Sequence, residues 1–293
     1  MEELKKNWYD KWYKALLIPP LLLVLVSLFY LYNVYAETGD FMKKDASLAG
    51  GTTITIKGNA DIYALEDSLR GEFPDIYVRN INDISTGRNI AFIIGSSAPP
   101  EQLQPALEKF LSYELNTDNS SIEFSGSALG SDFYKQLIQA IIISFILMSA
   151  VIFFMFRSFI PSIAVILAAF SDIVIALAAV NYLGINLSAA GIAAFLMLIG
   201  YSVDTDILLT TRVLKKKEVS VNQRIYGAFK TGIFMTLAGL ATVLPAFFLV
   251  TGLPDSFRQI FLIVAFGLSA DIIMTWLANA SIIKWYADYK KLG

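Results

Sequence analysis

Six long apolar segments stand out from the pattern of hydrophobic and polar positions along the chain. A helix needs about 20 apolar residues to cross a bilayer, and each of these segments is long enough. They are residues 15–35, 136–156, 161–182, 185–211, 231–250 and 259–283. The first is not expected to be a cleavable signal peptide, because its apolar run is too long and no A-x-A-like site follows it. The pattern predicts an α-helical integral membrane protein with six transmembrane helices.

The region between the first two apolar segments is polar and has shorter periods. Residues 50–58, GGTTITIKG, alternate between bounding glycines as a strand does. Further strands are predicted at 75–81, 87–97 and 120–126, and amphipathic helices at 60–73 and 98–115. The order β-α-β-β-α-β predicts an α+β domain of the ferredoxin-like type. Gly50-Gly51 opens a strand and not a helix, so no phosphate-binding loop is indicated.

Lysine and arginine residues are distributed unevenly between the two sides of the predicted spans. With the amino terminus inside, the cytoplasmic side carries Lys5, Lys6, Lys11, Lys14, Arg157, Arg212, Lys215, Lys216, Lys217, Arg224, Lys230, Lys284, Lys290 and Lys291. The short outer loops carry only Arg258, and Lys135 lies at the outer end of the second span. Positive charge is retained in the cytoplasm, so both termini of this multi-pass protein are expected there.

These patterns divide the chain into five parts. They are a cytoplasmic N-terminus (1–14), transmembrane helix 1 (15–36), the extracytoplasmic ferredoxin-like domain (37–132), a five-helix transmembrane bundle (133–283) and a cytoplasmic tail (284–293).

Composition agrees with a membrane protein and excludes several kinds of chemistry. Of 293 residues, 56% are hydrophobic and 16% charged, whereas soluble domains carry about 25% charged residues. The chain has no Cys and no His, so disulfides, thiol catalysis and histidine-ligated metals are excluded. We expect no cofactor, no metal, no enzymatic activity and no nucleic-acid partner.

Four aspartates lie within the apolar segments. They are Asp172, Asp204, Asp206 and Asp271. A charged residue at the centre of a membrane helix costs about 2.5–3.5 kcal/mol, so four cost on the order of 10 kcal/mol. Small residues at helical spacing share a stripe with Asp172 and with Asp271, and such stripes mark packing faces. We therefore expect these acids to face other helices or a wet cavity, and to act in proton or ion coupling.

Asp204 and Asp206 are about 200° apart around their helix and cannot serve one pocket. Neither is spaced from Arg212 as an i,i+4 pair. Their partners must come from another helix, from water or from protonation. The alternative is a structural role, in which each acid only hydrogen-bonds to a neighbouring helix.

Two segments resemble motifs of the SecF family of protein-export membrane proteins, of the archaeal type. Residues 157–177, RSFIPSIAVILAAFSDIVIAL, are similar to its third span, with Asp172 at the aspartate position. Residues 199–212, IGYSVDTDILLTTR, are similar to its most specific motif, G-Y-S followed by an aliphatic residue, N-D and a terminal arginine. The matching positions in that motif are Gly200, Tyr201, Ser202 and Arg212.

The chain departs from the bacterial pattern at the acids. Asp204 stands where that pattern has Asn, Thr205 where it has Asp, and Asp206 replaces a small polar residue. Lys230 stands where bacterial members have an arginine, and lysine does not reproduce the arginine fork. Which of Asp204 and Asp206 inherits the role is left open by the sequence.

The resemblance implies kinship with RND transporters and a cell-membrane location. It also implies a SecD-like subunit, the Sec translocation channel, a translocating polypeptide and membrane lipids as partners, with proton motive force moving the external domain. Half of a small-molecule or lipid RND exporter is the alternative. An intramembrane aspartyl protease is a third hypothesis, although its G-x-G-D motif is absent. A scaffold whose acids only fix helix packing is a fourth.

Overall fold

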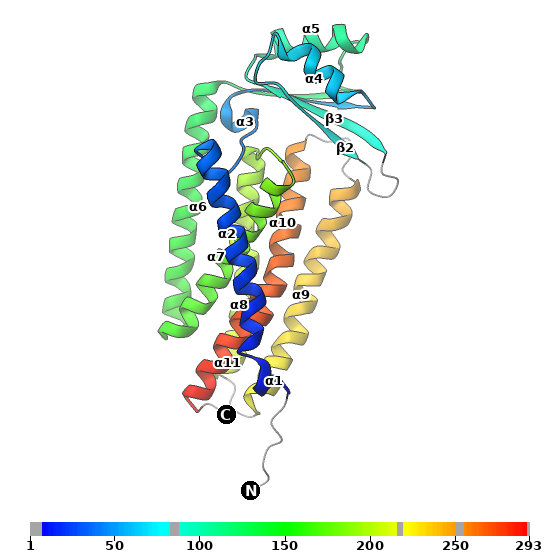
Figure 1. Ribbon diagram of the computed structural model, residues 1–293. Helices are drawn as coiled ribbons and strands as arrows, with labels where there is room; N and C mark the ends of the chain where they lie inside the picture. The colour runs from blue at the N-terminus through cyan, green and yellow to red at the C-terminus, as the bar shows by residue number, and fades with distance from the viewer. Residues whose placement is uncertain (1–7, 83–87, 216–218, 250–254, 292–293) are drawn as a thin grey trace.

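The molecule is elongated, with a small sheet domain at one end of a bundle of helices (Figure 1). The computed structural model describes residues 8–82, 88–215, 219–249 and 255–291. Both ends of this described chain lie at the end of the bundle remote from the sheet. Four of the lysines that contributed to the predicted orientation lie outside the described residues. They are Lys5, Lys6, Lys216 and Lys217.

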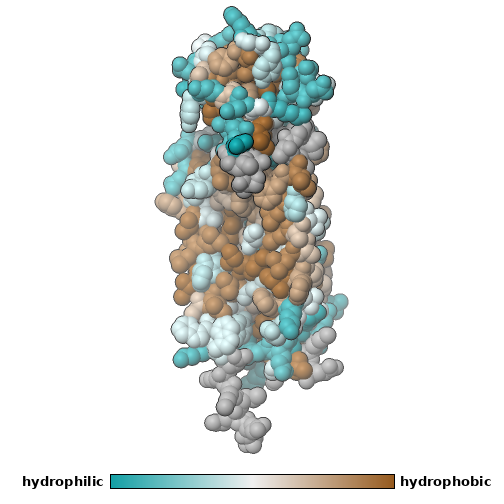
Figure 2. Space-filling model, turned by 90° about the vertical axis from the view of Figure 1, so that its right-hand side faces the viewer, coloured by the Kyte–Doolittle hydropathy of each residue, from teal (hydrophilic) through white to brown (hydrophobic). Residues whose placement is uncertain are grey.

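Six helices in the described ranges are long and apolar enough to cross a membrane, which confirms the predicted six-span architecture. They are α2 (Ile18–Thr38), α6 (Ser127–Phe156), α7 (Phe159–Tyr182), α8 (Ala189–Lys215), α9 (Val221–Leu249) and a last one composed of α10 (Asp255–Ile273), η2 (Met274–Asn279) and α11 (Ala280–Tyr289). Two short pieces precede α2, α1 (Trp8–Trp12) and η1 (Ala15–Leu17). Figure 2 shows hydrophobic side chains along the middle of one face and hydrophilic ones at both ends.

Local sequence explains where several of these helices begin and end. Pro19 and Pro20 lie in the first turn of α2, where a missing N–H costs nothing. Gly39 ends α2 in the left-handed conformation, with φ of 75°. Arg157 also has positive φ, 48°, and Ser158 is extended, so the chain turns sharply between α6 and α7. The π-helical η2 inside the last span was not anticipated from the sequence.

The sheet domain confirms the predicted order of strands and helices. It contains β1 (Gly51–Lys57), α4 (Ile62–Arg70), β2 (Tyr77–Asn82), β3 (Asn89–Ser96), α5 (Pro100–Leu111) and β4 (Ser120–Ser125). The strands are antiparallel neighbours in the order β2-β3-β1-β4, as in a ferredoxin-like fold. Paired residues of neighbouring strands, such as Ile54 of β1 and Ile94 of β3, are buried in one core with Leu65 of α4 and Leu103 of α5. Both helices cover the face of the sheet that points away from the bundle (Figure 1).

A short segment after α2 joins the sheet domain to the bundle. Asp45 N–H donates to Leu187 O (2.9 Å), and Leu187 N–H donates to Lys43 O (2.6 Å), just before α8 begins. Asn181, at the end of α7, donates to Phe41 O (2.8 Å). These bonds lead into α3 (Ala46–Ala49), which directly precedes β1. The sheet domain is therefore tied to the α7–α8 connection as well as to its flanking helices.

Three of the spans form the centre of the bundle. More than half of the residues in the apolar windows of α7, α8 and the last span are buried, compared with 6% for α6 and 11% for α9. Small residues allow the central helices to approach closely, as at Gly267 of α10, which packs against the Leu198 side chain of α8. All four intramembrane aspartates lie on these central helices. One of them lies on a surface of α8 that α6 and α9 do not cover.

Candidate functional site

Three of the four intramembrane acids are buried in the centre of the bundle. Asp172 of α7, Asp206 of α8 and Asp271 of α10 each have 0% of their surface exposed. Ser202 of α8 donates a hydrogen bond to Asp172 Oδ2, which joins α8 to α7. Thr205, also on α8, donates to Asp271 Oδ1 (2.7 Å), which joins α8 to α10. We call these three aspartates the carboxyl cluster.

Thr275 of η2 connects two members of the carboxyl cluster. Its Oγ1 lies 2.8 Å from Asp206 Oδ1 and 2.7 Å from Asp271 Oδ1. Asn279, one turn further along, donates from Nδ2 to Asp206 Oδ1 (2.6 Å). Thr236 of α9 donates to Asp271 Oδ2 (3.1 Å), so a fourth helix also contributes. The cluster is thus surrounded by hydroxyl and amide groups.

The geometry at Thr275 determines how protons can be arranged. A threonine hydroxyl carries one hydrogen and can donate it to one acceptor at a time. Two carboxyl oxygens lie within hydrogen-bond distance of this one hydroxyl. Both contacts are hydrogen bonds only if one of the two carboxyl groups is protonated and donates to Thr275 Oγ1. The sequence Asp206–Thr275–Asp271 is therefore a path along which a proton can be passed.

No cation neutralises this cluster within the described part of the chain. None of its three carboxyl groups forms an ion pair with a lysine or arginine there. Asp172 Oδ1 and Asp206 Oδ2 are buried and have no hydrogen-bond partner. An unpaired charge in such surroundings is strongly unfavourable, so the arrangement favours taking up a proton or a small cation. Among the described residues, no set of three acidic side chains converges as in a metal centre.

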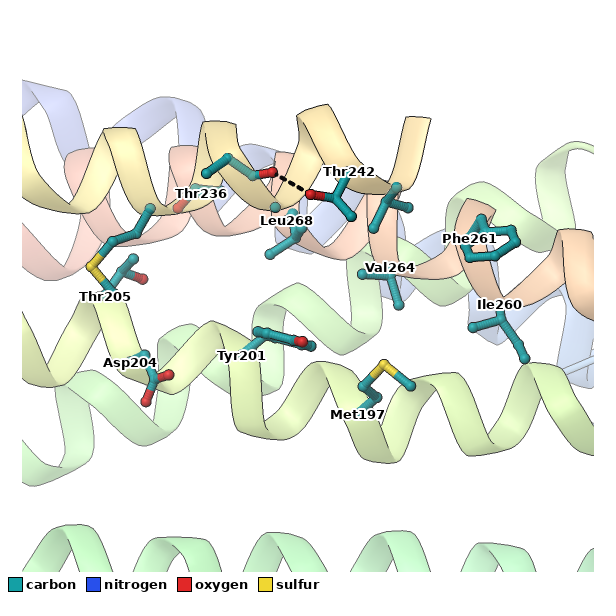
Figure 3. A pocket seen from close by; sticks show the side chains of 14 residues that line it. Met197, Tyr201, Asp204, Thr205, Thr236, Thr242, Ile260, Phe261, Val264 and Leu268 are labelled. Carbon is teal, nitrogen blue, oxygen red and sulfur yellow. Dashed lines mark hydrogen bonds between the residues drawn. The ribbon is translucent and has the colours of Figure 1, made fainter. Parts of the chain in front are cut away.

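Asp204 lies apart from the other three. As the 200° separation predicts, it faces away from Asp206, on an exposed stripe of α8 with Met197, Gly200 and Tyr201. Figure 3 shows Asp204, Tyr201 and Met197 following one another along α8 at the wall of a cavity of about 480 Å³. Helices α9 and α10 provide the opposite wall. The sequence predicts that each acid faces another helix or a wet cavity, and Asp204 lines this cavity. Its side chain is exposed in the single chain because α6 and α9 do not close over α8.

The remaining motif residues have separate roles in the structure. Arg212 donates to Gly227 O (2.5 Å) and joins the end of α8 to α9. Lys230 is exposed, with its ammonium group 5.1 Å from the centre of the Tyr226 ring. Only Ser202 of the G-Y-S motif reaches the carboxyl cluster. The lysine that stands at the bacterial arginine position does not contact the three buried acids in this arrangement.

The sequence reasoning did not identify the hydroxyl and amide partners of the acids. A signal existed in the last span, where Asp271, Thr275 and Asn279 follow one another at intervals of four. Polar residues at that spacing form one stripe of a helix. For Thr236, the sequence carried no comparable signal, because its nearest neighbours along α9 are apolar. Thr205 stands between Asp204 and Asp206, but this position does not indicate which acid its hydroxyl group contacts.

The fold and the site define a class of protein. This is a multi-pass membrane protein with a ferredoxin-like domain between its first two spans and hydrogen-bonded acids at the centre of its bundle. The family described as "Protein export membrane protein SecD/SecF, C-terminal" matches residues 106–289. The chain belongs to the SecF family of protein-export membrane proteins.

Individual relatives agree over almost the whole length. The chain is 37% identical over 287 residues to protein-export membrane protein SecF of Methanothermobacter thermautotrophicus, covering 96% of this chain and 94% of that protein. It is 34% identical over 275 residues to SecF of Methanolacinia petrolearia, covering 93% of each. These relatives are named for protein export and not as enzymes.

Solved structures share the fold. The crystal structure of SecDF from Thermus thermophilus, a translocon-associated membrane protein, superposes with a TM-score of 0.76 at 18% identity. The match covers 95% of this chain and 38% of that chain, so this chain spans well under half of the SecDF polypeptide. SecDF in a super-membrane-facing form superposes with a TM-score of 0.57.

Proposed function

We propose that this chain is the SecF-like subunit of a SecD–SecF-type complex that assists polypeptide translocation through the Sec channel. Membership of the SecF family supports this assignment. The SecDF chain of the same fold is more than twice as long. A separate SecD-like subunit supplying the remaining part accounts for that difference in length, since inverted or repeated halves are common in transporters.

We propose that protons or cations moving through the carboxyl cluster supply the energy for translocation. The observation that carries this proposal is the bridge at Thr275, where one hydroxyl hydrogen serves two buried carboxyl groups. In a purely structural role, the two side chains would not need to share one hydroxyl hydrogen, because an asparagine in place of one aspartate would supply its own N–H donors. One charge moving through 100 mV releases about 2.3 kcal/mol. That energy biases a two-state position of the sheet domain by more than tenfold.

The proposed orientation places the sheet domain outside the cell and both termini in the cytoplasm. In this orientation the extracytoplasmic part is 37–132 and the five-helix bundle is 133–283. Outside residues 37–132, ten of the twelve described lysines and arginines belong to the termini or to span ends that this orientation places in the cytoplasm, which supports it. The sheet domain would then be available to the emerging polypeptide.

The exposed stripe of α8 is the proposed contact surface for the SecD-like subunit. It places the carboxyl group of Asp204 on an exposed stripe of a helix that is long and apolar enough to span the membrane. Contact with lipid tails would cost about 2.5–3.5 kcal/mol, and a second subunit or trapped water removes that cost. A side chain added at Gly200 would meet no atom within 4 Å, so another helix can approach closely there.

The two roles are separated by testing Asp206→Asn and Asp204→Asn in the complex with the SecD-like subunit. In vesicles, Asp206→Asn should abolish proton flux and the dependence of translocation on membrane potential, with the complex still assembled. Asp204→Asn should mainly change recovery of the partner on co-purification. Asp132→Asn is the matched control, because that aspartate is exposed in the sheet-proximal part of α6. Unchanged translocation and potential dependence in Asp206→Asn would contradict the coupling.

One observation favours a second candidate, half of a small-molecule RND exporter. The cavity beside Asp204 is mostly apolar, carries one carboxyl group and has the size of a small-ligand site. Export of a cationic dye from vesicles by the assembled complex, lost in Asp204→Asn, would support this candidate over polypeptide translocation.

A further inference from the structure

A second cavity lies at the end of the bundle that holds the termini. It has a volume of about 560 Å³ and lies between α1, η1, α9 and η2. Its walls are largely aromatic and aliphatic. They include Trp8, Tyr9, Leu16, Tyr226, Phe229 and Trp276. No part of the carboxyl cluster or of the Asp204 cavity belongs to it, and we call it the aromatic groove.

The inner wall of the aromatic groove is built by Trp276. The indole ring meets Phe229 edge to face, with ring centres 5.2 Å apart, and lies directly over Gly232. The indole is 7% exposed, and its Nε1–H is buried without a hydrogen-bond partner among the described residues. A buried donor without a partner is unusual in a folded protein. The groove therefore combines an apolar wall with a free donor group.

The rim of the aromatic groove carries positive charge. Lys230 is held over the ring of Tyr226, which lines the groove, and Lys11 and Lys14 are exposed beside Leu16. The one acid on α1, Asp10, is already occupied, because Lys284 (3.0 Å) and Asn222 (2.9 Å) both contact it. Exposed ammonium groups therefore lie on both parts of the chain that line the groove, the α1–η1 segment and α9.

We propose that the aromatic groove binds one anionic phospholipid of the surrounding membrane. A hydrocarbon tail fills the space against Phe229 and Trp276, and the phosphate group lies between Lys14 and Lys230. The charge at the rim favours an anionic head group over a zwitterionic one, since polybasic sites near a membrane surface attract anionic lipids. A helix of a partner protein would satisfy the apolar wall but leave these lysines without a counter-charge.

A lipid bound in the groove would contact the segment of the last span that positions the carboxyl cluster. Trp276 belongs to η2, the same six-residue π-helical segment that includes Thr275 and Asn279. These two neighbours hold Asp206 through their hydroxyl and amide groups. π-Helical segments inside α-helices are frequent at functional sites. A lipid tail packed on Trp276 therefore supports the segment that positions the carboxyl cluster.

The site is tested in vesicles with the full chain and its partner subunit. Replacing Trp8, Trp12 and Trp285 with Phe leaves Trp276 as the only tryptophan of this chain, with a tryptophan-free version of the partner. Brominated phosphatidylglycerol should quench Trp276 at much lower mole fraction than brominated phosphatidylcholine. Two lysines near the phosphate correspond to about a 30-fold preference.

Variants separate head-group binding from simple contact with lipid tails. Lys14→Gln with Lys230→Gln should reduce the preference towards onefold, whereas Lys109→Gln, on α5 of the sheet domain, should leave it unchanged. Native mass spectrometry of the unsubstituted protein should show one retained anionic lipid, lost in the double lysine variant. Equal quenching by both lipids, or no quenching by either because another chain fills the groove, would overturn the proposal.

Discussion

Replacing Thr275 with Val removes the hydroxyl group that bridges two members of the carboxyl cluster while keeping the shape of the side chain. Asp206 would keep its bond from Asn279, and Asp271 would keep those from Thr205 and Thr236. The lost contact is a hydrogen bond to an ionisable group, which contributes about 1.5–3 kcal/mol. If that free energy is lost from the proton-transfer step, the rate falls about 10- to 150-fold.

The measurement is proton flux into vesicles that contain the complex with the SecD-like subunit, at a fixed membrane potential. Thr275→Ser is the matched control, because serine restores the hydroxyl and should recover most of the flux. Equal amounts of assembled complex are confirmed by co-purification, so that loss of folding is not mistaken for loss of transfer. Flux within twofold of the parent in Thr275→Val would refute the assignment of Thr275 as the proton bridge.

Three further outcomes follow from the packing and from the sheet domain. Gly267→Ala should destabilise the chain by about 1–3 kcal/mol in thermal unfolding, because the new methyl group would lie 2.2 Å from a buried Leu198 carbon. Gly200→Ala, on the exposed stripe, should leave the isolated chain as stable or slightly more stable but weaken recovery of the partner subunit; unchanged recovery would argue against that surface. Burial raises the pKa of Asp75, but hydrogen bonds from Ser97 and Ser96 outweigh it and hold the pKa below 3.8. The stabilisation from Asp75 is therefore present at neutral pH and lost as the pH falls below about 4, and a melting profile of Asp75→Asn should lack that part of the acid sensitivity.

Much of the architecture was predictable from local patterns. Six apolar segments identify the spans because hydrocarbon offers no hydrogen bonds to an open backbone, so each crossing must be a helix. The ferredoxin-like order followed from the change between period-2 and period-3.6 segments in residues 50–126. The cost of a charge in a bilayer also marked Asp172, Asp204, Asp206 and Asp271 as residues that must avoid lipid.

The composition of the site depended on tertiary structure. Thr205 and Asp271 are 66 positions apart, and Thr236 and Asp271 are 35 apart, so no helical period of either segment relates them. Only the packing of α7, α8, α9 and the last span decides that these groups meet. The same packing decides that Asp204 stays outside, because α6 and α9 flank α8 without covering it.

The sequence by itself therefore determined which residues must avoid lipid and how many times the chain crosses the membrane, since both are set by the free energy of transfer of each segment. The tertiary structure decided which acid joins which hydroxyl group, which acid stays on the exposed stripe of α8, and where a π-helical turn brings Thr275 between two carboxyl groups. Those outcomes depend on how helices approach one another, and the approach is set by side-chain shape across interfaces that no single segment contains.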